Sequence, residues 1–167
     1  MRRARAAVGS VVFLVVAPGT VAGFGPWRLT GWQAGDSLPR WLPVRAVGLA
    51  LVLAGAVVLL HAFARFVSEG IGTPAPVAPP ERLVVGGAYR YVRNPMYVAL
   101  EAIICGQALL LGRAVLLVYA AAFGAVVAAF VRWYEEPTLS RRFGADYDAY
   151  RRAVPAWLPR RTPWKES

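Results

Sequence analysis

The chain has 167 residues, of which 57% are apolar and only 17% are charged, and its formal net charge is +10. Soluble domains usually carry about 25% charged residues, so the composition excludes an ordinary soluble globule. Long apolar runs and 12% aromatic residues exclude disorder. A single Cys and a single His argue against a disulfide framework and a His-rich metal site. The composition therefore indicates a small integral membrane protein.

Four apolar segments approach the roughly 20 residues that a helix needs to cross a bilayer. They cover residues 6–22, residues 46–64, a stretch that follows Asn94-Pro95 and runs to Gly112, and residues 114–131. Only the short connection Gly112-Arg113 joins the apolar runs of the last two segments, which predicts a tight antiparallel hairpin. The sequence thus predicts an all-α integral membrane protein with about four transmembrane helices.

The first apolar segment has two interpretations. It follows Arg2, Arg3 and Arg5 and ends in small residues, as a cleavable signal peptide does. Apolar sequence that continues through Phe24 and Trp27 favours a retained helix.

The distribution of basic residues predicts the orientation. With both termini in the cytoplasm, 15 of the 19 basic residues fall on the cytoplasmic side, which is a strong positive-inside bias. The basic excess therefore indicates membrane orientation and contact with anionic membrane lipids, with no nucleic-acid partner. We expect a bacterial-type inner (cytoplasmic) membrane, with two helices and an outer loop in residues 1–67 and the functional core in residues 68–167.

The first cytoplasmic stretch leads into the third apolar segment. Its proline-rich part, residues 74–80, is expected to be extended chain. Asn94 and Pro95 predict a helix start, with Asn as the N-cap and Pro at the first helical position. The tyrosines and arginines of residues 89–97 are then either interfacial anchors or, together with the helix N-terminus, a patch for a ligand with a carboxylate and a cationic or aromatic portion.

The second cytoplasmic stretch follows the fourth apolar segment. Pro137 predicts a break after Glu136 and a new helix that begins at the proline. Beyond it, apolar residues recur at helical spacing and predict an amphipathic helix that lies on the membrane or closes over the site. These residues are Leu139, Phe143, Tyr147, Tyr150 and Val154.

Three carboxylates are candidates for chemistry. Glu135 and Glu136 either pair with Arg132 or Arg93, or recognise a ribose diol, an amino group or a sulfonium. Glu101 lies inside the third apolar segment, where a carboxylate is costly unless it faces the helix bundle or a cavity. Both a structural and a functional role remain open for it.

Residues 83–97 (LVVGGAYRYVRNPMY) and residues 135–159 (EEPTLSRRFGADYDAYRRAVPAWLP) flank the hydrophobic hairpin. In this order they resemble the isoprenylcysteine carboxyl methyltransferase and phospholipid methyltransferase superfamily of integral membrane enzymes, over roughly residues 65–160. The resemblance implies a methyltransferase core that binds S-adenosyl-L-methionine in a pocket at the cytoplasmic membrane face. It also implies a hydrophobic or lipid-like methyl acceptor, whose reacting group is a carboxylate, an amine or a thiol.

The resemblance also implies site residues. Arg132 or Glu136 would lie nearer the acceptor, as the catalytic residues. The family commonly has Arg-His-Pro where this chain has Arg93-Asn94-Pro95, and Asn cannot act as a general base. The implied cofactor contacts are Leu83, Val84, Tyr89, Arg93, Asn94, Pro95, Met96, Tyr97 and Glu135.

Two other functions fit parts of the sequence. An NADPH-dependent membrane reductase would use Arg90 and Arg93 as phosphate ligands. A non-catalytic membrane protein would use Glu135 and Glu136 only to pair with arginines. The sequence does not indicate the oligomeric state.

Overall fold

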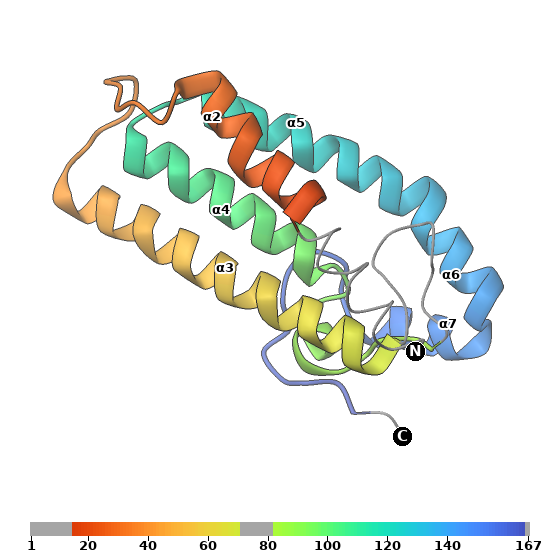
Figure 1. Cartoon of the computed structure of the whole chain (residues 1–167). Helices are drawn as coiled ribbons and strands as arrows, with labels where there is room; N and C mark the ends of the chain where they lie inside the picture. Colours follow the sequence, from red (N-terminus) through yellow and green to blue (C-terminus); the bar gives the residue numbers. More distant parts are fainter. Residues whose placement is uncertain (1–14, 71–81, 166–167) are drawn as a thin grey trace.

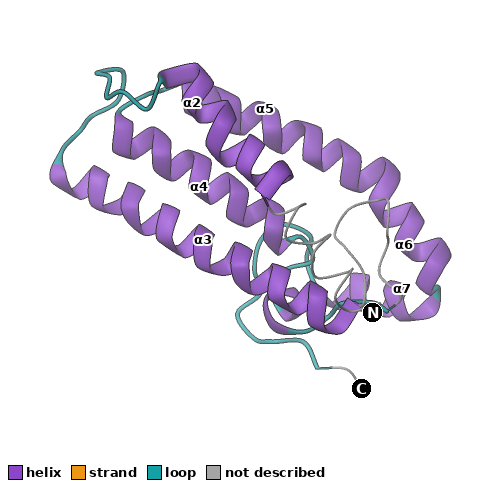
Figure 2. Ribbon diagram, in the orientation of Figure 1, coloured by secondary structure: helices purple, strands orange, loops and turns teal. Residues whose placement is uncertain are grey.

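The computed structural model describes residues 15–70 and 82–165, and every regular element in these ranges is helical (Figure 2). The prediction of an all-α chain is therefore confirmed for the described residues. The start of the first apolar segment, with its signal-peptide interpretation, and the proline-rich residues 74–80 lie outside them.

The N-terminal helix extends further than the first apolar segment predicts. Residues 15–19 are α-helical, a π-helical turn η1 (Thr20–Phe24) follows, and α2 (Gly25–Thr30) completes the helix. Pro26 sits in the first turn of α2, where its missing N–H is tolerated. Gly31 ends the helix in the left-handed conformation, with φ of 57°.

The three long helices that follow run antiparallel in succession (Figure 1). The first, α3 (Leu42–Gly70), is longer at both ends than the predicted residues 46–64. It is followed by α4 (Pro95–Leu111) and α5 (Val115–Phe130). Gly112, with φ of 67°, forms the turn between the last two, which confirms the predicted hairpin.

The predicted helix break at Pro137 is wrong. The helix of α5 continues through a π-helical turn, η3 (Val131–Glu135), into α6 (Glu136–Phe143). A proline inside an α-helix crowds the carbonyl four residues before it and donates no hydrogen bond. In the wider π turn the N–H of Glu136 instead donates to the carbonyl of Val131, five residues back. The helix thereby accommodates the proline without breaking.

The chain bends at Gly144, whose φ of 55° and ψ of −127° are not helical. The last helix, α7 (Ala145–Ala153), follows directly. The predicted single amphipathic helix is therefore two short helices. The predicted apolar stripe nevertheless packs into one cluster, which contains buried Tyr147, Tyr150 and Val154 with half-buried Leu139 and Phe143.

Two helical segments are long and apolar enough to cross a membrane, Leu42–Arg65 and Val115–Phe143. Only 28% and 22% of their apolar windows are buried inside the protein, unlike the core helix of a soluble domain. The helix α4 is apolar but has only 17 residues, or about 25 Å. Among the described residues, two of the four predicted membrane-spanning helices therefore meet the length requirement.

The core lies between α3, α4 and α5, with η1 packed against α4. Figure 1 shows that α3 ends, α4 begins and α7 lies at the same end of the bundle. Both polar stretches of the sequence therefore meet there. The buried apolar residues of the hairpin are Ile104, Ala108, Leu116 and Ala120.

Candidate functional site

The stretch that enters the hairpin and the stretch that leaves it are joined by backbone hydrogen bonds. The N–H of Arg93 donates to the carbonyl of Pro155 at 2.9 Å, and the N–H of Arg160 donates to the carbonyl of Tyr91 at 2.9 Å. The irregular C-terminal chain is therefore held against the residues that precede α4. No periodic pattern of residues in the sequence predicts these backbone hydrogen bonds.

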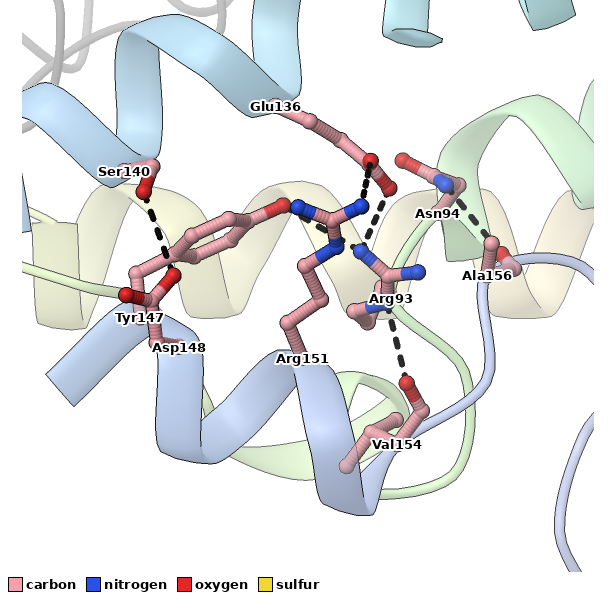
Figure 3. Close-up of polar contacts among 9 residues, drawn as sticks. All are labelled: Arg93, Asn94, Glu136, Ser140, Tyr147, Asp148, Arg151, Val154 and Ala156. Carbon is pink, nitrogen blue, oxygen red and sulfur yellow. Dashed lines mark hydrogen bonds and ion pairs between the residues drawn. The ribbon is translucent and has the colours of Figure 1, made fainter. Parts of the chain in front are cut away.

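A buried ion pair reinforces this junction (Figure 3). Nη1 of Arg93 lies 2.5 Å from Oε1 of Glu136, and the two side chains are only 12% and 9% exposed. Arg151 of α7 reaches the other carboxylate oxygen at 3.3 Å. Arg93 also donates from Nε to the carbonyl of Val154 at 2.9 Å and from Nη1 to the hydroxyl of Tyr147 at 3.2 Å. The pairing of Glu136 with Arg93 matches the structural alternative of the sequence analysis.

Asn94 does not cap α4 with its side chain. It occupies the predicted N-cap position, but no side-chain cap hydrogen bond forms there. Its Nδ2 instead donates to the carbonyl of Ala156 at 3.1 Å (Figure 3). The prediction of a capping side chain is wrong: the bond to Ala156 holds the amide toward the C-terminal segment, and its oxygen makes no cap bond. The first turn of α4 is thus left without a side-chain cap.

Glu135 faces a different partner from Glu136. Its Oε2 accepts a hydrogen bond from the hydroxyl of Tyr97 at 3.2 Å. Tyr97 belongs to the first turn of α4, whereas Glu135 ends η3. Both side chains are half-buried. The structure therefore brings a carboxylate and an aromatic side chain together beside an uncapped helix N-terminus.

The apolar residues of the proposed cofactor patch pack into the protein. Val84 and Tyr89 are buried against α3, with Met96 half-buried beside them. Leu83 packs against the cluster formed by α7. Pro95 is fully buried. These residues therefore attach the stretch before α4 to α3 and to the C-terminal cluster.

Gly87 lies where the stretch before α4 comes close to α3. Its φ is +57°, which side-chain-bearing residues rarely adopt, and an added Cβ would lie 2.5 Å from Nε2 of His61. The left-handed backbone and the close approach of the His61 side chain both favour glycine at this position.

Burial keeps the hydroxyl groups of two tyrosines of α7 protonated. Burial raises the pKa of the Tyr147 hydroxyl, an effect that the neighbouring Arg93 partly opposes. Burial also raises the pKa of the Tyr150 hydroxyl well above its ordinary value. Both hydroxyls therefore stay protonated at neutral pH, and that of Tyr150 donates to the carbonyl of Tyr89 at 2.7 Å.

The remaining arginines differ in their surroundings. Arg132 is exposed on η3. Arg90 donates from Nε to the carbonyl of Trp164 at 2.6 Å. The phosphate ligands that a reductase would need, Arg90 and Arg93, are thus engaged with main-chain carbonyls. Sequence reasoning missed Trp164, whose ring lies 5.4 Å from that of Tyr150.

Comparison with known proteins identifies the family of the chain. A sequence model of the family described as phospholipid methyltransferase matches residues 44–146, which is more than half of the chain. The match covers most of α3, the hairpin and α6, and it confirms the resemblance found in the sequence. No curated protein and no solved structure gives a significant match. With apolar helices of membrane-spanning length, the chain is a membrane protein that belongs to the phospholipid methyltransferase family.

Proposed function

We propose that the chain transfers a methyl group from S-adenosyl-L-methionine to a hydrophobic or lipid-like acceptor at the cytoplasmic membrane face. The observation that carries this proposal is the hydrogen bond between Tyr97 and Glu135, beside the uncapped start of α4, in a member of a methyltransferase family. The ion pair between Arg93 and Glu136 holds the two stretches that supply these groups.

The residues present fit the chemical groups of this methyl donor. The donor carries a carboxylate, an ammonium and a sulfonium. An uncapped helix N-terminus offers N–H groups and a positive dipole to the carboxylate. Glu135 can accept hydrogen bonds from the ammonium or from the ribose hydroxyls, because Tyr97 occupies only one of its oxygens. The ring of Tyr97 can attract the sulfonium by a cation–π interaction.

Methyl transfer places modest demands on the protein. When bound, the sulfonium supplies an electrophilic methyl group, so the chain needs mainly to align the acceptor with it and to exclude water. Leu83, Val84 and Met96 belong to apolar clusters of the stretch that leads into α4, and we assign them to excluding water. No proton needs to move through Asn94, whose amide is engaged with a carbonyl.

The two residues expected near the acceptor receive different roles in this proposal. Glu136 is buried and held between two arginines, so we assign it to positioning the entering stretch. Arg132 is exposed one turn before it on the same helix, and we keep it as the residue that meets the acceptor. Both lie at the end of the bundle that we place in the cytoplasm of a bacterial-type cell, with the two termini on the same side.

Calorimetry on the detergent-solubilised chain tests the proposal with S-adenosylhomocysteine as the probe. We expect Glu135→Gln to weaken binding about 10–100-fold, because a charge-assisted hydrogen bond is worth about 1.5–3 kcal/mol. Tyr97→Phe should weaken it less, because the ring remains. Tyr119→Phe is the matched control, since its hydroxyl bonds the carbonyl of Val21 elsewhere in the bundle. If the three variants and the wild type bind S-adenosylhomocysteine with equal affinity, the proposed binding site is refuted.

A second experiment addresses the acceptor. Membranes that contain the chain are incubated with radiolabelled S-adenosyl-L-methionine and separated into lipid, small-molecule and protein fractions. We expect label in a lipid or hydrophobic fraction. Label confined to water-soluble products would contradict the proposed acceptor class.

A further inference from the structure

Buried polar side-chain atoms of the apolar helices have hydrogen-bond partners, with one exception among the described residues. Gln107 donates to the carbonyl of Ala22 at 2.7 Å, and Tyr119 donates to the carbonyl of Val21 at 2.9 Å. Glu101 differs, because its buried Oε2 has no hydrogen-bond partner among the residues that the structure describes. An unsatisfied oxygen inside a membrane helix is costly, and polar residues kept there are commonly functional.

The position of Glu101 relates it to the proposed site. It lies four residues after Tyr97 on α4, and residues four apart share a helix face. One helical turn separates them, about 6 Å along the axis. The carboxyl of Glu101 therefore lies on the face of α4 that carries the bond to Glu135, on the side of the hairpin turn.

The opposite helix leaves room for this carboxyl. A Cβ added to Gly124 of α5 would lie 2.6 Å from Oε1 of Glu101, and within 4 Å it would otherwise meet only Cδ of the same side chain. Glu101 thus points between the two helices of the hairpin. An alanine at position 124 would therefore crowd this carboxyl and no other residue outside its own stretch of helix.

We propose that Glu101 determines acceptor specificity, by accepting a hydrogen bond from an N–H or O–H group at the polar end of the methyl acceptor. This inference rests on the proposed function. A donor group on the acceptor satisfies the unpartnered oxygen, whereas an acceptor carboxylate is repelled by like charge in a low-dielectric region. Of the acceptor groups compatible with the sequence, the carboxylate is therefore disfavoured, and acceptors that carry a hydrogen-bond donor are preferred.

The test compares two probes of equal chain length, dodecylamine and dodecanoate. The full chain is reconstituted in phosphatidylcholine nanodiscs, and binding is followed through the probe-dependent rise in unfolding temperature. We expect the wild type to bind dodecylamine at least tenfold more tightly than dodecanoate. Glu101→Gln should reduce this ratio at least fivefold, because the amide has no charge and can donate to a carboxylate.

Two further variants separate specificity from stability. Gly124→Ala should lower the binding ratio in the same direction, because it crowds the carboxyl and no other residue outside its own stretch of helix. Gln107→Leu, the matched control, removes a polar group of the same helix that already has a partner. It should lower the unfolding temperature of the free protein and leave the ratio unchanged.

The outcomes distinguish this inference from the proposed function. Equal binding ratios for the wild type and Glu101→Gln would overturn the assignment of Glu101, and so would a wild type without preference for dodecylamine. Unchanged binding of S-adenosylhomocysteine by Glu101→Gln is expected, because the residue lies on the acceptor side. Absence of that binding in the wild type would overturn the proposed function instead.

Discussion

Replacement of Glu136 by glutamine tests the ion pair that holds the two polar stretches together. The carboxylate is 9% exposed, and its partner Arg93 is 12% exposed, so neither charge is well solvated. Glu136→Gln keeps the size and the hydrogen-bonding oxygen of the side chain. It removes the charge that compensates the buried guanidinium.

The expected loss of stability follows from this burial. Removing one partner of a buried ion pair costs about 3–5 kcal/mol, because the other charge stays buried without compensation. For a protein of this size, 1 kcal/mol lowers the unfolding temperature by about 2–4 °C. Glu136→Gln should therefore lower it by about 6–20 °C. The effect on α5 itself should be small, because the replaced side chain lies beyond the apolar helix.

The same carboxylate offers a matched control. Arg151 contacts its other oxygen at 3.3 Å but is 43% exposed, and such pairs contribute about 0–1 kcal/mol. Arg151→Gln should therefore lower the unfolding temperature by no more than about 4 °C. Tryptophan fluorescence during heating of the detergent-solubilised chain measures both variants. Equal losses for the two would refute the argument from burial.

Three smaller predictions concern other parts of the fold. Gly87→Ala should destabilise the chain by at least about 1–2 kcal/mol, because of its left-handed φ and the approach of His61; thermal unfolding measures this. Asn94→Ala should cost about 1 kcal/mol through the lost bond to Ala156, and limited proteolysis should then cleave the C-terminal segment faster. Arg113→Ala, at the opposite end of the bundle, should leave the affinity for S-adenosylhomocysteine unchanged; a large loss in calorimetry would contradict the proposed placement of the site.

The sequence correctly predicts the helices that are marked by apolar runs or by apolar residues at helical spacing. A long apolar run predicts the helix over residues 46–64. The short polar interruption at Gly112 between two apolar runs predicts the hairpin. The apolar stripe from Leu139 to Val154 is predicted correctly as a set of residues that pack together, although Gly144 divides its helix. The family resemblance rests on the two polar stretches and is confirmed.

The sequence does not predict contacts made by irregular chain. Asn94 and Arg93 bind carbonyls of Ala156 and Val154, which any residue could supply. Backbone acceptors leave no trace in side-chain pattern, so these partners are visible only in the fold. The same reasoning explains why the N-cap prediction failed while the helix start was placed correctly.

The prediction of a helix break at Pro137 failed for a different reason, and the sequence does contain a signal for the continuous helix. In both π turns of the described chain, one residue separates the end of the turn from a proline: Gly25 precedes Pro26, and Glu136 precedes Pro137. A wider turn gives the backbone another hydrogen-bonding register just before the proline. A helical pattern that continues up to a proline is therefore as compatible with a π turn as with a break.

The adjacent carboxylates at the end of η3 have separate roles. Successive residues leave a helix in different directions, and Glu135 and Glu136 accordingly contact different partners. Glu136 faces Arg93 and the C-terminal segment, whereas Glu135 faces Tyr97 on α4. Within one helical turn, Glu136 thus holds the stretch before α4 through Arg93, and Glu135 places a carboxylate beside the start of α4. Because the first contact fixes the helix that carries the second, loss of the ion pair should weaken cofactor binding even though Glu136 touches no ligand in this arrangement.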